Sequence, residues 1–415
     1  MTHETYDVIV AGGGSAGVGA AIASAETGAR TLLVEKYNCL GGASTMRNVV
    51  TYCGLYSLGE TPEIVVGGVA ARVMEELTRR NAVTGPHRHR GVYVVFDPET
   101  VKLVLDKLCR EAGVEVLMGG FVVGAERQND RVSSLTVADH SGLRKFRAGA
   151  FVDCTGEGDL LAQSGADTRY GNGHDVNLGT LGTRFGGIPA EVEVTAIDIA
   201  TAVGQLGPNR KKVTKDKSVV TRLPFSHDLV CYVASYDYDP RDAASMSGAE
   251  ENGRQQAWIY LDAIRSIPGC AGAYLVSTGP EFGTRESRHL QSQRMFRWDD
   301  VLERRSFDDC IALGAWGAEW HNREDFSSTL DIPPGGASYQ IPMSCLTSRN
   351  TSNLFAAGRL ADGDKLGGAA IRVMGTAFAT GQASGVAAAQ MSVNGGALNI
   401  DALRKTLGAQ GAILA

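Results

Sequence analysis

The chain reads YDVIVAGGGSAG over residues 6–17, an apolar run followed by a glycine-rich turn. A stretch of small residues, 16–25, comes next, and a second apolar run, RTLLVE, ends at Glu35. This pattern predicts a buried strand over 6–11, a closely packed helix over 16–25 and another strand ending at Glu35. The spacing G-x-G-x-x-G between a strand and a helix, with an acidic residue about 20 positions later, indicates a dinucleotide-binding fold.

The three glycines of this motif have separate physical roles. Gly12 permits the tight turn, Gly14 lets the backbone approach a pyrophosphate, and Gly17 lets helix and strand pack closely. The N-terminus of the helix supplies unpaired N–H groups and positive potential. Glu35 is expected to accept hydrogen bonds from ribose hydroxyls. A glycine-rich turn in an ordinary α/β protein is the alternative, which the complete context of the motif disfavours.

The composition is that of a globular protein with more than one core. At 415 residues the chain exceeds what one hydrophobic core usually supports, so two subdomains are expected. Glycine accounts for 52 of the 415 residues, about 12.5%, which is well above the usual ~7%. The additional glycines lie mainly in segments that resemble motifs. The net charge of −6 gives no reason to expect nucleic-acid or membrane binding. The one basic stretch, residues 210–222, is expected to be a solvated loop.

The cysteines exclude several kinds of site. Eight cysteines are scattered along the chain without a C-x-x-C pair, which argues against an iron–sulfur cluster, a zinc site or a disulfide-reductase centre. No metal site is expected. Unpaired thiols suit a reducing compartment, and the polar N-terminal residues lack the basic start of a signal peptide. We therefore predict a cytoplasmic protein.

Residues 61–153 show signals for helices and then for strands. Thr61-Pro62-Glu63 and Asp97-Pro98-Glu99 each place a proline at the first position of an expected helix. Residues 114–118 read as a strand, and residues 121–153 alternate short strand-like runs with turns. We interpret the latter as an antiparallel β-meander laid on a parallel sheet.

The pattern changes near residue 165 and changes back near residue 340. Between these points, mixed helix and strand signals predict an inserted domain. Residues 353–358 then read as a short buried strand, and residues 372–391 as a long helix rich in alanine and glycine. The sequence thus predicts an α/β fold with a Rossmann-like, discontinuous nucleotide-binding domain (1–164 and 341–415) and an inserted α+β substrate or cap domain (165–340).

Five motifs in order carry a family resemblance. They are the 12–17 turn with Glu35 and the LGG loop (40–42), DCTGEGD (153–159), TRESR (284–288), YQIP (339–342) with 353–359, and IRVMG (371–375). With these motifs the sequence resembles the FAD-dependent oxidoreductase family of the glutathione-reductase-like flavoprotein superfamily, in particular its bacterial group. Residues 165–280 carry no matching motif.

The resemblance implies FAD as the cofactor and a role for each matching segment. Gly12, Gly14 and Gly17 would hold the pyrophosphate, and the meander would contact the adenine. The helix after Met374 would direct its N-terminus at the isoalloxazine ring. The implied FAD-binding residues are Gly12, Gly14, Ser15, Ala16, Gly17, Glu35, Lys36, Gly41, Gly42, Ala43, Ser44, Val122, Thr155, Gly156, Gly358, Arg359, Gly375 and Thr376.

Only one G-x-G-x-x-G is present, so a second nucleotide site for NAD(P)H is not expected. Electrons must then pass between FAD and a substrate, oxygen or a partner. The catalytic candidates are Arg285, Glu286, Lys365 and Arg372, because an arginine can orient a carboxylate and a buried lysine can act as a base. Many relatives have a histidine where this chain has Lys365. Ion pairing between the two domains is the alternative role of the TRESR segment.

The sequence therefore predicts an FAD-dependent oxidoreductase that transfers a hydride between a small organic substrate and the flavin. A flavoprotein subunit of an electron-transfer complex and an FAD-dependent monooxygenase are alternatives. A third is a dinucleotide-binding protein without redox turnover, such as a thiazole-synthase-like or RNA-modifying relative, although the net negative charge disfavours RNA. The substrate, the direction of electron flow, covalent attachment of FAD and homo-oligomer formation are left open.

Overall fold

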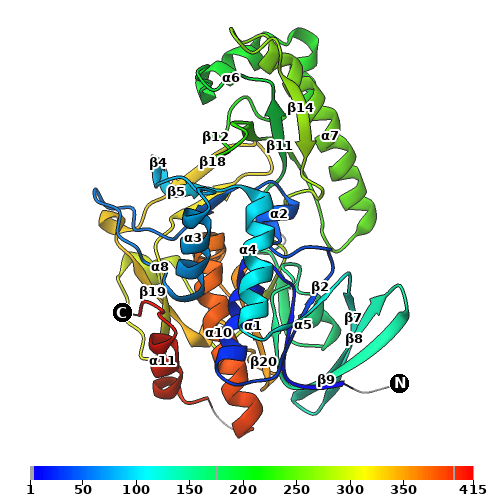
Figure 1. Cartoon of the computed structure of the whole chain (residues 1–415), viewed down its shortest axis with the longest axis vertical. Coiled ribbons are helices and arrows are strands. Elements are labelled where there is room, and N and C mark those ends of the chain that lie inside the picture. The colour runs from blue at the N-terminus through cyan, green and yellow to red at the C-terminus, as the bar shows by residue number, and fades with distance from the viewer. Residues whose placement is uncertain (1–3, 174, 396–397, 415) are drawn as a thin grey trace.

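A seven-stranded mixed sheet lies at the centre of this computed structural model, which describes residues 4–173, 175–395 and 398–414 (Figure 1). The strand order is β6-β2-β1-β9-β8-β7, and β20 pairs with β9. The strands are β1 (Glu4–Ala11), β2 (Thr31–Glu35), β6 (Glu115–Met118), β7 (Phe121–Gln128), β8 (Arg131–Asp139), β9 (Gly142–Asp153) and β20 (Leu354–Ala356).

The sheet has a parallel part and a meander, joined by β9. Strands β6, β2, β1, β9 and β20 are parallel, whereas β7, β8 and the first half of β9 form an antiparallel meander. The predicted strands and the predicted α/β class are confirmed. Ala11 lies opposite both Val34 and Asp153, so the carboxyl ends of β1, β2 and β9 meet at one edge. Ligands of open α/β sheets bind at this edge.

Two helices rich in small residues lie side by side against the sheet. They are α1 (Ser15–Glu26) and α10 (Met374–Asn394), drawn in blue and orange in Figure 1, and both predicted helices are confirmed. A Cβ at Gly381 would lie 2.0 Å from the carbonyl oxygen of Ala16, and one at Gly385 would lie 2.0 Å from that of Ala20. Only glycine therefore permits this approach of the two backbones.

The two helices predicted from proline signals have different outcomes. Helix α4 (Pro98–Glu111) begins as predicted, because the side chain of Asp97 accepts a hydrogen bond from the backbone N–H of Thr100 at 2.7 Å. The helix predicted from Thr61 does not begin there. Helix α3 starts only at Gly68 and ends at Arg79.

Tertiary contacts explain the late start of α3. Ile64 forms a β-bridge with Tyr56, and the N–H of Val65 donates to the carbonyl of Leu55 at 2.8 Å. The segment after Pro62 therefore folds back on the preceding chain and does not coil. Gly68 has φ +59, which ends this extended segment.

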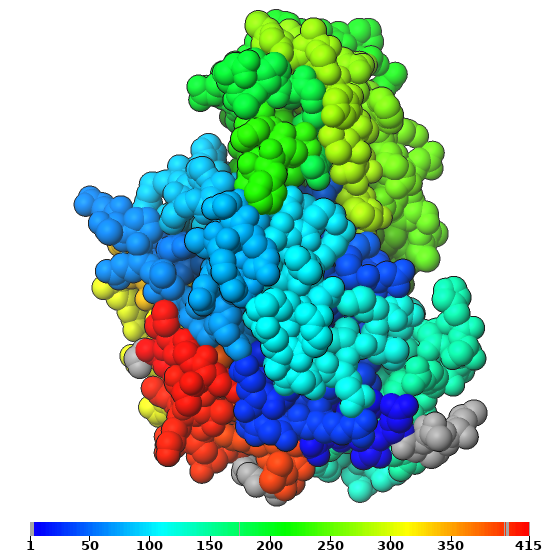
Figure 2. Space-filling model, in the orientation of Figure 1, coloured from blue at the N-terminus to red at the C-terminus, as the bar shows by residue number. Residues whose placement is uncertain are grey.

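A four-stranded antiparallel sheet with two helices forms the upper part of the molecule, drawn in green in Figures 1 and 2. Its buried side chains form a separate core between Val176 and Phe282. The elements are β11 (Gly179–Gly186), α6 (Ala196–Gly204), β12 (Val220–Arg222), β13 (Leu229–Tyr236), α7 (Ala243–Arg265) and β14 (Tyr274–Thr278).

The shorter elements complete the lower part. Phe296, Cys310 and Ile341 share one core with α1 and α10. The strands are β3 (Thr51–Cys53), β4 (His87–His89), β5 (Gly91–Val95), β10 (Thr168–Tyr170), β15 (Arg288–Leu290), β16 (Cys310–Gly314), β17 (Ala318–His321), β18 (Ser328–Asp331) and β19 (Tyr339–Pro342). The helices are α2 (Ala43–Met46), α5 (Asp159–Gln163), α8 (Trp298–Leu302), α9 (Lys365–Ile371) and α11 (Ile400–Ala409). Over the described ranges, no helix has the length and apolarity needed to cross a bilayer.

Candidate functional site

The glycine-rich turn joins β1 to α1 at the carboxyl edge of the sheet. Gly12 has φ +93, and a Cβ there would lie 2.4 Å from the carbonyl oxygen of Cys154. A Cβ at Gly17 would lie 1.7 Å from the carbonyl oxygen of Gly12. Both positions therefore exclude any larger residue, and the start of α1 is held directly above the strand ends.

A second loop, residues 40–42, closes over this turn. The N–H of Gly41 donates to the carbonyl of Gly13 at 2.9 Å, and a Cβ at Gly42 would lie 3.0 Å from the Cα of Gly14. The two loops thus place bare backbone on facing sides of one groove. This is the surface that a pyrophosphate needs for close approach.

Glu35 lies at the end of β2, next to the turn. Its carboxylate accepts hydrogen bonds from the backbone N–H groups of Gly13 at 2.5 Å and Tyr37 at 2.9 Å. The side chain is only 4% exposed, and this burial raises its pKa. Glu35 nevertheless lines the cavity described next, where its remaining lone pairs can accept from a ligand's hydroxyl groups.

A single cavity of about 1020 Å³ runs from the glycine-rich turn to the underside of the upper sheet. Fourteen of the eighteen residues implied as FAD ligands line it: Gly12, Gly14, Ser15, Ala16, Glu35, Lys36, Gly41, Gly42, Ala43, Val122, Thr155, Gly156, Gly358 and Arg359. They come from both ends of the chain and from the meander, so the fold gathers them at one place.

The other four of these residues lie behind the cavity lining. Gly17 packs on Gly12, and the hydroxyl of Ser44 donates to the carbonyl of Gly41 at 2.9 Å. A Cβ at Gly375 would lie 2.4 Å from the carbonyl of Cys53. The hydroxyl of Thr376 is buried and has no hydrogen-bond partner among the described residues. These four residues therefore shape the cavity wall from behind.

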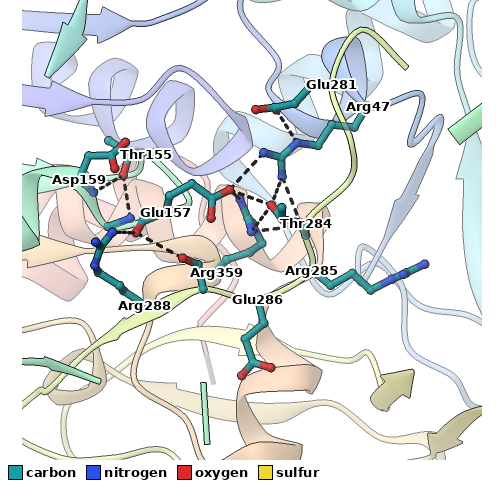
Figure 3. A network of polar contacts seen from close by, with 12 residues as sticks. Arg47, Thr155, Glu157, Asp159, Glu281, Thr284, Arg285, Glu286, Arg288 and Arg359 are labelled. Atoms are coloured by element: carbon teal, nitrogen blue, oxygen red, sulfur yellow. Dashed lines mark hydrogen bonds and ion pairs between the residues drawn. The ribbon is translucent and has the colours of Figure 1, made fainter. Parts of the chain in front are cut away.

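A buried ionic network connects the upper and lower parts beside the cavity (Figure 3). The Oε1 atom of Glu157 accepts from Arg47 at 3.1 Å, from Arg359 at 2.9 Å and from the hydroxyl of Thr284 at 2.7 Å. Arg47 also donates to Glu281 at 2.6 Å. Burial alone would raise the pKa of Glu157, but Arg359 and Arg47 outweigh it and lower that pKa.

Two of the four catalytic candidates line the cavity. Arg285 donates to the carbonyl of Leu178 and, at 2.8 Å, to the hydroxyl of Thr180. Arg372 immediately precedes the N-cap of α10 and donates to the carbonyl of Glu319 at 3.3 Å. Burial and the neighbouring Arg372 lower the pKa of Arg285 to about 10. The positive charge of Arg372 therefore acts unfavourably on that of Arg285.

Glu286 lies outside the cavity lining. Figure 3 shows Arg285 and Glu286 pointing in different directions from consecutive positions. The carboxylate of Glu286 accepts from the N–H of Asn177 at 2.8 Å, from the Asn172 amide at 3.0 Å and lies 2.8 Å from Nε2 of His289. Its contacts hold the polypeptide segments together behind the site.

Lys365 also lies outside the cavity lining. It is the first residue of α9, whose N-cap is Asp364. Its ammonium group pairs with Asp175 at 2.7 Å and lies 4.2 Å from the ring centroid of Trp320. The side chain is 45% exposed, so the structure does not bring Lys365 together with Arg285 and Arg372.

Three charged or titratable residues that the sequence analysis missed line the cavity beside the two arginines. They are Lys215, Glu319 and His321. The expectation of a solvated loop over 210–222 is wrong for Lys215, which is only 8% exposed and lines the cavity. Glu319 and His321 alternate along β17, and this spacing of two places them on one face. That alternation was the available signal.

Electrostatics sets the protonation of these residues. The Nζ atom of Lys215 lies 3.2 Å from Nδ1 of His321, and Nε2 of His321 lies 3.4 Å from Glu319. Burial and Arg285 lower the pKa of His321 to about 3 and that of Lys215 to about 7. Burial would raise the pKa of Glu319, but His321, Arg372 and Arg285 lower it overall. We call Lys215, Arg285 and Arg372 the cation cluster.

In the part of the chain that the structure describes, no three His, Cys, Asp or Glu side chains form a group that could hold a metal ion.

The site geometry fits FAD, because a cradle of bare backbone, a buried acceptor and a long cavity occur together. A family model described as FAD dependent oxidoreductase matches residues 7–407. The chain therefore belongs to the FAD dependent oxidoreductase family, and its cofactor is FAD. The family resemblance seen in the sequence is confirmed.

Two curated relatives match part of the chain. The thiamine thiazole synthase of Aeropyrum pernix is 31% identical over 177 residues, which is 40% of this chain and 60% of that protein. The digeranylgeranylglycerophospholipid reductase of Methanocaldococcus jannaschii is 27% identical over 132 residues, which is 31% of this chain and 32% of that protein. The chain thus covers less than two thirds of the length of either relative.

Two solved structures share the fold across nearly the whole chain. A geranylgeranyl bacteriochlorophyll reductase-like protein from Thermoplasma acidophilum has a TM-score of 0.50 at 13% identity, covering 99% of this chain and 84% of that one. BexE, described in connection with oxidation during BE-7585A biosynthesis, has a TM-score of 0.51 at 16% identity, covering 98% and 66%. At these identities the likeness concerns the fold.

Proposed function

We propose that this protein transfers a hydride between a small organic substrate and FAD. The observation that carries the proposal is the single cavity, which extends from the glycine-rich turn to the cation cluster. A cofactor anchored at the turn leaves the other end of the same cavity for a substrate. When bound, FAD supplies the hydride-accepting and hydride-donating chemistry.

The two ends of the cavity suit the two ends of the cofactor. We assign the turn, Glu35 and the 40–42 loop to the adenosine diphosphate part, and the meander residue Val122 to the adenine side. Val373 and Met374, at the start of α10, line the other part of the cavity. The N-terminus of α10 presents unpaired N–H groups and partial positive charge, which would favour the anionic form of a reduced flavin ring.

We propose that the upper part of the molecule is a cap over the substrate end. The proposal keeps the division predicted from the sequence. In this division, the FAD-binding domain comprises residues 1–164 and 341–415, and the cap comprises residues 165–340. The separate core between Val176 and Phe282 supports a cap. Residues 296–346 contribute to the core of the lower part, which favours a smaller cap than the predicted inserted domain.

The test measures cofactor binding and reduction directly. The purified protein is titrated with FAD and is then mixed anaerobically with a panel of metabolites, followed by oxygen. We expect FAD uptake and loss of the flavin absorbance with a substrate. Rapid reoxidation by oxygen marks an oxidase or monooxygenase, and slow reoxidation marks a dehydrogenase.

Two further measurements, of co-purifying proteins and of reduction by dithionite, separate the alternatives. Co-purification of an iron–sulfur protein that reoxidises the flavin would favour an electron-transfer subunit. A bound nucleotide that resists reduction by dithionite would favour a thiazole-synthase-like protein and contradict hydride transfer, as would a protein that takes up no FAD.

A cytoplasmic location is also a proposal. All eight cysteines are free thiols, which suits a reducing compartment.

A further inference from the structure

The cation cluster gives one end of the cavity a net positive charge. Arginine side chains stay protonated in proteins, so Arg285 and Arg372 are both positively charged. Glu319, which lies 3.8 Å from Arg372, is a carboxylate whose negative charge offsets them. His321 is neutral, because burial and Arg285 lower its pKa to about 3. The two arginines alone thus exceed Glu319 by one charge, and protonated Lys215 adds another. Closely spaced like charges are relieved by an anion between them.

Both arginines also have donors left over. Arg285 uses its Nη1 for Leu178 and Thr180, and Arg372 uses its Nη2 for Glu319. Among the described residues, no hydrogen bond uses Nη2 of Arg285 or Nη1 of Arg372. A guanidinium group has five N–H donors in a planar fork that matches a carboxylate.

Aromatic side chains line the same cavity. Tyr93, Tyr232 and Trp316 provide apolar surface, and Tyr232 is near enough to Arg285 to affect its pKa. Small-molecule sites typically combine such apolar surface with a few fixed polar groups. The occupant therefore needs an organic body as well as a negative charge.

We propose that this end of the cavity binds the carboxylate of an organic-acid substrate, oriented by Arg285 and Arg372, with Lys215 as the third cation. The inference rests on the proposed function, because it places the substrate beside the flavin end of the same cavity. It names the substrate class of that site.

Lys215 makes the affinity depend on pH. Burial and Arg285 lower its pKa to about 7, with Glu319 acting in the opposite direction. Lys215 is therefore charged below pH 7 and loses its charge as the pH rises, so carboxylate affinity falls between pH 6 and 8.5. His321 faces the ammonium group of Lys215. The backbone N–H of Lys215 donates to the hydroxyl of Tyr260 at 3.0 Å.

Other titratable groups line this cavity and require a control. Burial, Asp153 and Glu157 raise the pKa of Asp159 to about 7. His89 and the carboxylates Asp216 and Asp325 also lie on the lining, with Arg90, Arg210 and Lys217. A Lys215→Met variant separates the contribution of Lys215 from theirs.

The experiment uses the FAD-loaded protein and matched pairs of probes. Acetate, succinate and benzoate are compared with acetamide, succinamide and benzamide by flavin absorbance shift and by calorimetry, at pH 6 to 8.5. We expect at least one carboxylate to bind and its amide not to bind. Equal binding of acid and amide, or binding of inorganic phosphate without any carboxylate, would overturn the proposal.

Variants locate the site. Arg372→Met and Arg285→Met should each weaken carboxylate binding at least about 10-fold, as expected for loss of a charge-assisted hydrogen-bonded pair. Arg372→Lys, which keeps the charge and protects folding, should weaken it less. Lys215→Met should flatten the pH dependence. Arg349→Met, whose side chain is 52% exposed and pairs with Asp167, is the control and should bind normally.

Two outcomes distinguish the two proposals. A wild-type protein that binds FAD but no carboxylate, or variants with unchanged affinity, would refute the organic-acid site and leave hydride transfer standing. A wild-type protein that binds no FAD would refute the proposed function. Calorimetry on that protein would still decide whether the cation cluster binds carboxylates.

Discussion

Glu35 has two roles in this fold, one in ordering the glycine-rich turn and one in lining the cavity. It ends β2 and accepts two backbone hydrogen bonds, one from Gly13 in the turn. It therefore orders the turn and presents acceptor capacity to the cavity. Burial of a carboxylate is unfavourable unless hydrogen bonds compensate, and here the backbone supplies them.

Replacing Glu35 tests this role. Glu35→Gln keeps the size but removes the negative charge that accepts hydrogen bonds. We expect FAD to bind about 10- to 100-fold more weakly, as loss of a hydrogen bond to a charged group predicts. The FAD dissociation constant from fluorescence titration measures this. Glu99→Gln, at a 70% exposed side chain on α4, is the control. Wild-type affinity in Glu35→Gln would contradict the assignment.

Lys365 gives the opposite prediction at the residue scale. Its ammonium group pairs with Asp175 at the surface and does not line the cavity. We expect Lys365→Ala to leave the rate of anaerobic flavin reduction within about twofold and to change stability by less than about 1 kcal/mol. A rate reduced by more than tenfold in stopped-flow measurements would restore Lys365 to the catalytic residues.

At the scale of elements, the contact between α1 and α10 determines where the cavity wall lies. Gly381 and Gly385 let α10 touch the backbone of α1 near Ala16 and Ala20. This contact fixes the start of α10 relative to the glycine-rich turn. The close approach depends on glycine, although glycine inside a helix is itself unfavourable.

Alanine substitutions separate packing from helix propensity. Gly385→Ala should destabilise the protein by about 1–3 kcal/mol, because overpacking outweighs the gain of up to ~1 kcal/mol in propensity. Gly248→Ala is the matched control in α7, where a Cβ meets nothing within 4 Å, and should be neutral or stabilising. Urea denaturation measures both variants. If Gly385→Ala raised the free energy of unfolding, α1 and α10 could move apart without a loss of stability, which would contradict the prediction.

At the scale of the whole molecule, the ionic network of Figure 3 joins the upper and lower parts. Arg47 from the lower part binds Glu281 and the carbonyl and hydroxyl of Thr284. Burial would raise the pKa of Glu281, but Arg47 and Lys36 lower it to about 2. The two parts are thus coupled through buried charge.

This coupling predicts acid sensitivity. The pKa of Glu281 is about 2 in the folded protein and ~4.3 in an unfolded chain, so its contribution is complete above pH ~4.5 and is lost as the pH falls toward 2. That contribution is on the order of 2–3 kcal/mol. The difference in unfolding free energy between wild type and Glu281→Gln should therefore shrink from pH 6 to pH 3 in urea titrations. A difference that stays constant with pH would contradict it.

The sequence by itself determined the glycine-rich turn that we propose as the cofactor end of the site. The turn, Glu35 and the start of α1 depend on backbone conformations and close approaches that neighbouring residues specify, so their signals lie within 30 residues. The start of α3 was predicted wrongly because the bridge between Ile64 and Tyr56 overrides the local proline signal.

Only the tertiary structure decided which side chains gather at the end of the cavity that we propose for the substrate. Lys215, Arg285, Arg372 and the β17 pair Glu319 and His321 come from four separate segments. The motifs of the sequence had indicated Arg285 and Arg372, but no local pattern indicated that Lys215, Glu319 and His321 would join them. The fold of the whole chain brings them together, and burial and neighbouring charges then change their pKa values. Local sequence specifies where backbone must approach a cofactor, whereas charges that act through space are specified by the packing of the whole chain.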